Sequence, residues 1–268
     1  MLLKRILTAS IIMPITVFSI LVLTQTGLAL ALALILIVSS CEYCNLIQIK
    51  HLAGKALYTL VILVVTYFLS STPSNLTVVL YASAVWWLIA LIWVAMYPKG
   101  SSLLRKNLVV KLVNGLFILV PMAISLMALH SKDSSLVLFL LVLIWASDIG
   151  AYFVGKFFGR NKLCLDVSPG KTFEGVYGGI ALAQVVAILY VYISTQTPIL
   201  NDFLIFSFLG LMISLVAVLG DLFESVLKRI AEVKDSGNIL PGHGGVLDRI
   251  DSLTSSAPIF FLLFTFLL

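Results

Sequence analysis

Long apolar runs alternate with short polar segments along the whole chain. The runs are long enough to cross a hydrocarbon core of about 30 Å as helices, and the short alternating segments of a membrane β-barrel are not seen. Because lipid offers no partner to free backbone groups, the helix is the expected spanning element. We therefore predict an all-α polytopic membrane protein with about nine spans, at residues 6–24, 28–48, 56–72, 77–97, 107–129, 134–155, 173–194, 203–221 and 256–268. The last run is the shortest, so we expect it to be tilted or to pack as a partial helix.

Composition and charge support this topology. The chain is 61% hydrophobic, with a mean hydropathy of +1.14. If the N-terminus with Lys4 and Arg5 is cytoplasmic, Lys132 is the one residue among 17 Lys and Arg that falls on the far side, as the positive-inside rule favours. We interpret the first run as an uncleaved span rather than a signal peptide. The net charge of +5 then reflects topology, and we expect no nucleic-acid partner.

Acidic residues divide the chain into two parts. Glu42 is the single acid before Asp133, whereas the second half holds the other acids and most of the glycines. The simplest description is one membrane domain over 1–268. Residues 1–130 would be a scaffold with dimer and lipid contacts, and residues 131–268 a catalytic half.

The first of three polar clusters lies at the end of the sixth predicted span. Asp148, Tyr152, Lys156 and Arg160 recur every four residues and would form one stripe on a helix. An aspartate there is costly, so a functional role is the default, and a simple ion pair with Lys156 is the alternative. Three glycines would let another backbone approach closely: Gly150, Gly155 and Gly159.

The second cluster precedes the seventh predicted span. Ser168 before Pro169 is typical of an N-cap followed by proline at the first helical position. Lys171 would then lie in the first helical turn beside free N–H groups, where a phosphate can bind. The spacing is not that of a P-loop, and a simply capped helix start explains it equally well.

The third cluster, at residues 220–252, is the richest in charge. Asp221, Glu224, Ser225 and Lys228 fall on one face of a helix that continues out of the eighth span, with Glu224 and Lys228 also spaced as a simple i,i+4 pair. A glycine-rich turn follows. A second helix is predicted from about Val246, with these residues on one face: Asp248, Asp251 and Ser252.

Carboxylates among many Lys and Arg residues indicate a Mg²⁺–polyphosphate site. Mg²⁺ prefers one or two carboxylates together with substrate phosphate oxygens, and phosphoryl transfer needs charge neutralisation and positioning more than covalent catalysis. His243 beside glycines is more typical of a hydrogen-bonding group than of a catalytic base.

The spacing of the third cluster resembles a known family. Ser225-x-x-Lys228-Arg229, Lys234-Asp235-x-Gly237, Leu240-Pro241-x-His243-Gly244-Gly245 and Asp248-Arg249-x-Asp251 are similar to the signature of the phosphatidate cytidylyltransferases, or CDP-diacylglycerol synthases. The other two clusters and the nine-span layout resemble that family too. The N-terminal half resembles it in hydropathy alone.

The resemblance implies that CTP and phosphatidate are converted to CDP-diacylglycerol and pyrophosphate. It further implies Mg²⁺ with a potassium ion, a homodimer among membrane lipids, and a site facing the cytoplasm at the bacterial cytoplasmic (inner) membrane. The aspartates corresponding to Asp221 and Asp248 hold metal in that family.

From these residues we expect the following roles. Asp221 and Asp248 bind metal, while Asp148 and Asp251 contact metal or ribose. Cationic groups that hold triphosphate or lipid phosphate are Lys171, Lys228, Arg229 and Arg249. Further substrate contacts are expected from Ser168, Glu174, Ser225, His243, Gly244 and Gly245.

Three alternatives remain. A CDP-alcohol phosphatidyltransferase would need an Asp-Gly-x-x-Ala-Arg run, which is absent. A CTP-dependent polyprenol or dolichol kinase would share the nucleotide. An ion- or proton-coupled transporter would use Asp148 and Asp221 as coupling sites and should place them near the bilayer midplane.

Overall fold

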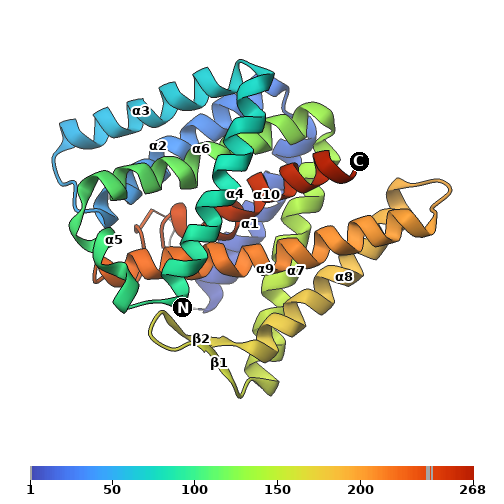
Figure 1. The fold of residues 1–268 in the computed structure, drawn as a ribbon. Coiled ribbons are helices and arrows are strands. Elements are labelled where there is room, and N and C mark those ends of the chain that lie inside the picture. The colour runs from blue at the N-terminus through green and yellow to red at the C-terminus, as the bar shows by residue number, and fades with distance from the viewer. Residues whose placement is uncertain (1, 240–241, 243) are drawn as a thin grey trace.

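The chain folds as a bundle of long helices with one small hairpin (Figure 1). The computed structural model describes residues 2–239, 242 and 244–268. In chain order the elements are α1 (Leu2–Val22), α2 (Gln25–Leu46), α3 (Leu52–Ser70), α4 (Pro73–Ala95), η1 (Lys99–Ser101), α5 (Ser102–Lys106), α6 (Leu108–Lys132), α7 (Ser134–Phe158), β1 (Lys162–Cys164), β2 (Ser168–Thr172), α8 (Phe173–Ser194), α9 (Leu200–Ile230) and α10 (Leu247–Leu267).

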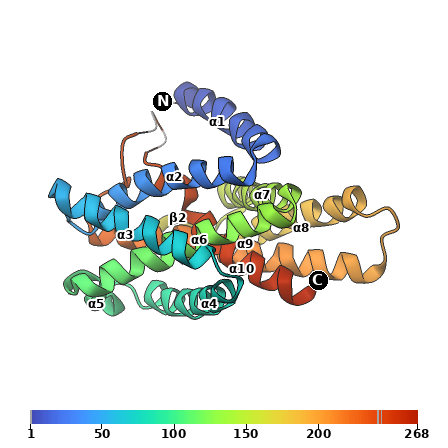
Figure 2. The same cartoon turned by 90° about the horizontal axis from the view of Figure 1, so that it is seen from above.

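The predicted polytopic all-α class is confirmed. Among the described residues, eight helices are long and apolar enough to cross a membrane, namely α2, α3, α4, α6, α7, α8, α9 and α10. The apolar part of α1, Ser10–Val22, is shorter, and this helix lies at the outer edge of the bundle (Figure 2). A count near nine therefore holds. The most enclosed span is α6, with 67% of its apolar window buried, so it lies at the centre of the packing.

Several spans begin where a polar side chain replaces the missing backbone acceptors of the first turn. Thr24 accepts a hydrogen bond from the Gly27 amide at 3.2 Å. Asn107 accepts from Val109 at 2.9 Å, and Asp133 does the same for Ser135 at 2.8 Å. Such caps fix where each helix starts.

The last two spans are longer than predicted. The predicted span 256–268 is too short, because its helix α10 begins at Leu247 and is of full spanning length. The helix start expected near Val246 is thereby confirmed. The helix of the eighth span, α9, runs for 31 residues to Ile230, which confirms the expected continuation beyond Asp221. In both helices, polar residues that face a cavity extend the helix beyond its apolar run.

The stretch before α8 is a β-hairpin rather than a helix start. Strands β1 and β2 pair antiparallel and form a small two-stranded sheet in the otherwise helical fold. Ser168 and Pro169 lie in β2, and the N-cap of α8 is Thr172, whose hydroxyl accepts a hydrogen bond from the Gly175 amide at 3.1 Å. Proline is tolerated in an edge strand because it has no N–H to leave unpaired.

Glycines bring α7 and α8 into close contact, as predicted. A Cβ on Gly150 would strike the carbonyl of Gly178 and lie 3.1 Å from the Gly179 Cα. A Cβ on Gly175 would lie 3.0 Å from the Ala151 carbonyl oxygen. The two backbones therefore touch directly, which fixes the position of the polar stripe on α7 relative to the start of α8.

Candidate active site

A polar cavity of about 620 Å³ lies between α7, β2, α8, α9 and α10. This volume is in the range of small-molecule binding sites. Seven of the site residues predicted from the sequence line it: Asp148, Lys171, Asp221, Lys228, Asp248, Arg249 and Asp251. The hairpin between α7 and α8 and the loop between α9 and α10 thus lie at the same end of the bundle, as the charge pattern predicted.

Lys171 and Asp221 form an ion pair across the cavity. The Lys171 Nζ lies 2.7 Å from the Asp221 Oδ2, with side-chain exposures of 23% and 33%. Lys171 comes from the hairpin and Asp221 from the last third of α9. The hydroxyl of Ser225, one turn along α9, is 3.4 Å from the other Asp221 oxygen. Asp221 is therefore a third exposed, and the oxygen that faces Ser225 has only a long hydrogen bond.

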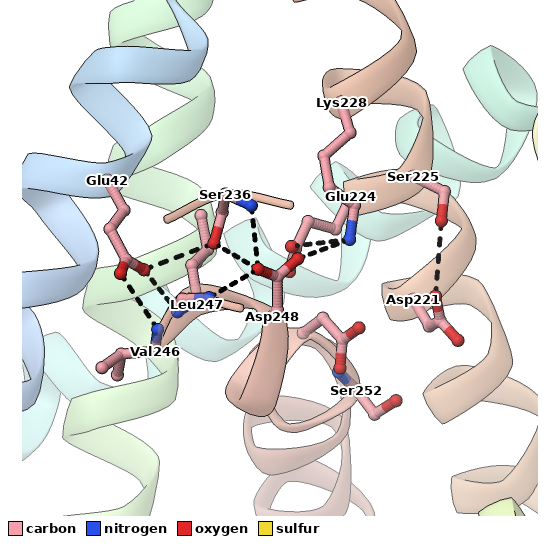
Figure 3. Close-up of polar contacts among 12 residues, drawn as sticks. Glu42, Asp221, Glu224, Ser225, Lys228, Ser236, Val246, Leu247, Asp248 and Ser252 are labelled. Carbon is pink, nitrogen blue, oxygen red and sulfur yellow. Dashed lines mark hydrogen bonds and ion pairs between the residues drawn. The ribbon is translucent and has the colours of Figure 1, made fainter. Parts of the chain in front are cut away.

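Lys228 on α9 pairs with two carboxylates, Glu224 on the same helix and Asp248 on α10 (Figure 3). Its Nζ lies 2.7 Å from the Asp248 Oδ1 and 3.2 Å from the Glu224 Oε1. The predicted i,i+4 pair is thus present, and the aspartate on the next helix is a second partner. Glu224 and Asp248 are buried, with 5% and 8% of their surface exposed. Lys228 is therefore held as an internal counterion.

The second oxygen of Asp248 is hydrogen-bonded to the loop that precedes α10. Its Oδ2 accepts hydrogen bonds from the Ser236 amide at 2.8 Å, the Ser236 hydroxyl at 2.9 Å and the Gly245 amide at 2.8 Å. Gly244 has a φ of +78°, and a Cβ there would lie 2.7 Å from the same oxygen. The glycines thus bring the backbone against this carboxylate, and the Gly245 amide is already engaged with it.

Glu42 on α2 supports the same loop from the other half of the chain. Its carboxylate accepts hydrogen bonds from the Val246 amide at 3.1 Å and the Leu247 amide at 2.8 Å, and lies 3.3 Å from the Ser236 hydroxyl. Glu42 is 3% exposed. Glu42 was not among the predicted site residues, although it is the single acid before Asp133.

The remaining predicted carboxylates, Asp148 and Asp251, face the cavity. The carboxylates of Asp148 and Asp251 repel each other electrostatically, and each also repels Asp221. Asp148 lies ten residues before the end of α7, which places it roughly 15 Å along the helix from that end. The cavity therefore extends from the helix ends well into the bundle.

The donor chemistry fits Mg²⁺ bound together with a phosphate ligand. In the described part of the chain, no three His, Cys, Asp or Glu side chains meet as a ready-made metal site. Mg²⁺ bound through substrate phosphates needs one or two carboxylates. The partly exposed carboxylate of Asp221 is suited to this. Both oxygens of Asp248 are hydrogen-bonded or ion-paired, so metal binding there requires exchange with Lys228.

Some predicted residues hold the scaffold rather than line the cavity. Glu174 accepts hydrogen bonds from the amides of Arg160 and Asn161, which fastens the hairpin to α8. The Arg229 Nε donates to the Val167 carbonyl at 3.1 Å, which fastens the hairpin to α9. Ser168 lies in β2, and His243 lies outside the described residues. The cavity also includes residues that were not assigned to the site from the sequence, among them Tyr152, Lys156 and Asp235.

Comparison with known proteins agrees with the resemblance noted in the sequence. A sequence model of the cytidylyltransferase family matches residues 3–267. A phosphatidate cytidylyltransferase of Haemophilus influenzae is 35% identical over the full length of both chains. One from Pseudomonas aeruginosa is 37% identical over 97% of this chain and 96% of its own. One from Bacillus subtilis is 51% identical over 47% of this chain and 46% of its own. The chain therefore belongs to the cytidylyltransferase family, as a multi-pass integral membrane member.

Proposed function

We propose that this chain is a phosphatidate cytidylyltransferase, which converts CTP and phosphatidate to CDP-diacylglycerol and pyrophosphate. The observation that carries the proposal is the cavity, where acidic and basic side chains from α7, β2, α9, α10 and the loop before α10 meet inside an otherwise apolar bundle. The full-length relatives named for this activity support it.

The reaction needs neutralisation of phosphate charge rather than a strong base. The phosphate of phosphatidate is already anionic, so one of its oxygens attacks the α-phosphorus of CTP while the bond from that phosphorus to the pyrophosphate oxygen breaks. Repulsion between the anions dominates the barrier, and fixed cations lower it. Lys171 and Arg249 face the cavity for this purpose, while Lys228 joins them when it exchanges a carboxylate for a phosphate oxygen.

We assign the metal-binding role to Asp221 and, after release of Lys228, to Asp248. Bound Mg²⁺ would neutralise phosphate charge and orient the triphosphate, with a potassium ion as the second cation of the site. Asp148 and Asp251 remain as partners for metal or ribose on the cavity wall.

The lipid substrate would arrive sideways from the bilayer along the exposed aromatic side chains of α7. Tyr152 lines the cavity and is 60% exposed, and the neighbouring Phe153 and Phe157 are also exposed. The Lys156 Nζ lies 5.6 Å from the centre of the Tyr152 ring. A lysine over aromatic rings is suited to hold an anionic headgroup at the membrane interface while the acyl chains stay in hydrocarbon.

The orientation and assembly belong to the same proposal. The polar end of the bundle would face the cytoplasm at the bacterial cytoplasmic membrane, with a cytoplasmic N-terminus and a homodimer as the working unit. The orientation is supported by the distribution of Lys and Arg along the chain and by the position of both basic loops beside one cavity; the homodimer is proposed from the family resemblance.

The test is a product assay with purified protein in detergent micelles. CTP, Mg²⁺ and phosphatidate should yield CDP-diacylglycerol and pyrophosphate, identified by mass spectrometry. A parallel arm with a polyprenol in place of phosphatidate should give no phosphorylated product. If no lipid phosphate gives a CTP-dependent product, the proposed function is wrong; phosphorylation of the polyprenol instead would identify a kinase.

A further inference from the structure

We propose that Glu42 is a positioning residue for the transfer reaction, which sets the orientation of Asp248 from a helix in the other half of the chain. The inference rests on the proposed function for its kinetic consequences and on the geometry around α10 for its structural ones. Glu42 itself does not line the cavity among the described residues.

The start of α10 has no cap from a neighbouring residue in the sequence. The N-cap position is Val246, whose side chain cannot accept a hydrogen bond. The first amides of a helix have no partner inside it, and here the Glu42 carboxylate accepts two of them, from Val246 and Leu247. A negative charge at a helix N-terminus also interacts favourably with the helix dipole. Glu42 thus does from α2 what a local N-cap does elsewhere.

Glu42 and Asp248 contact the same loop, on either side of Ser236 and Gly245 (Figure 3). The Ser236 hydroxyl lies 2.9 Å from the Asp248 carboxylate and 3.3 Å from that of Glu42. The hydroxyl has one proton, and it donates this proton in a hydrogen bond to the nearer carboxylate, that of Asp248. The Gly245 amide, next to the two amides held by Glu42, also donates to Asp248. Movement of Glu42 would therefore shift the Gly245 amide that holds Asp248 and open space beside the Ser236 hydroxyl.

Two glycines in the loop between α9 and α10 leave space for the Glu42 carboxylate. A Cβ on Gly237 would lie 2.8 Å from the Glu42 Cδ, and a Cβ on Gly245 would lie 2.6 Å from it. Both glycines are part of the loop between α9 and α10, and their missing side chains let the loop close around the carboxylate. This fit is specific to a side chain from α2 and would serve no purpose for a ligand in the cavity.

The consequence is a fixed position for Asp248 relative to its partner Lys228, 2.7 Å away. Loss of a residue that orients a ligand typically costs about 10- to 100-fold in metal affinity or activity. The conservative substitution Glu42→Gln keeps the shape but turns an NH₂ group toward a backbone N–H. We expect it to lower kcat by about 10- to 100-fold and to raise the Mg²⁺ concentration that gives half-maximal rate.

The experiment compares Glu42→Gln with Ser40→Ala in the full-length protein in micelles. Ser40 is a buried residue of the same helix, and its hydroxyl contacts Thr59 at 2.8 Å, away from the site. Hydrogen exchange is measured over residues 232–250 beside the kinetics. Glu42→Gln should speed exchange at the amides of Ser236, Val246 and Leu247, whereas Ser40→Ala should leave that exchange and kcat unchanged.

Each outcome decides the matter. Wild-type kcat and wild-type exchange in Glu42→Gln would overturn the inference. So would a slower rate that merely follows the amount of folded protein, with an unchanged Mg²⁺ dependence, because that is the result of a structural role alone. If Glu42→Gln does not insert, Ser236→Ala replaces it, and wild-type kcat in that variant overturns the inference. An inactive wild-type protein would refute the proposed function instead, while the exchange measurement would still test the contact.

Discussion

Asp248→Asn separates the electrostatic role of this residue from its role as a hydrogen-bond acceptor. In the less costly orientation, the asparagine oxygen keeps the amides of Ser236 and Gly245, and its NH₂ group faces the Lys228 Nζ, formerly 2.7 Å from a carboxylate oxygen. Two donors then meet where an ion pair stood. The substitution therefore preserves the loop and removes the charge.

The magnitude follows from the burial of the pair. Removal of one partner of a buried ion pair costs about 3–5 kcal/mol. Lys228 keeps Glu224 at 3.2 Å and is 14% exposed, so we expect a smaller loss of about 2 kcal/mol in the free energy of unfolding. Turnover should fall far more, by at least about 10²-fold, because the charge that holds metal and fixes Lys228 is gone.

The assay follows CDP-diacylglycerol formation and thermal unfolding of the same micellar preparation. Asp133→Asn is the matched control, since Asp133 caps α7 through the Ser135 amide and asparagine caps a helix as well as aspartate does. The control should keep wild-type activity and melting temperature. Wild-type turnover in Asp248→Asn would refute the metal role of Asp248. If the variant loses activity because it fails to insert, then the substitution does not preserve the loop, and the charge and the hydrogen bonds of Asp248 have not been separated.

Three further predictions use other contacts. Lys171→Met should raise the KM for CTP about tenfold or more, because it removes a cation from the cavity and its 2.7 Å pair with Asp221; an unchanged KM in steady-state assays would contradict this role. Lys156→Gln should raise the KM for phosphatidate in mixed micelles while the KM for CTP stays constant, and the opposite pattern would exclude the lipid route along α7. Gly150→Ala should cost about 1–3 kcal/mol, since its Cβ would strike the Gly178 carbonyl, and an unchanged melting temperature would disprove that contact.

The helical parts of the site were predictable because their polar residues follow the helical period. The carboxylates of α9 and α10 were predicted on facing helices from their spacing, and the structure places Asp221, Asp248 and Asp251 on one cavity. Hydrophobic runs likewise predicted the helical layout. Both signals are local in the sequence, so they survive without knowledge of the fold.

The hairpin and the role of Glu42 were beyond such signals. Ser168 and Pro169 suit the start of a helix as well as an edge strand, and the choice depends on pairing with β1 and on the cap provided by Thr172. Glu42 carries no local pattern at all, because its partners are the amides of Val246 and Leu247, which any residue except proline provides.

The contact between α2 and the start of α10 also has a consequence for biosynthesis. Glu42 and its partner amide on Val246 are 204 residues apart, so at about 5–20 residues per second the ribosome needs roughly 10–40 s to supply that partner. During this interval the carboxylate must remain in water or at the headgroups near the membrane surface. Insertion of the last helix then both closes the bundle and removes that charge from solvent. Nascent chains that stop after α9 would leave the Glu42 carboxylate without the amides of Val246 and Leu247.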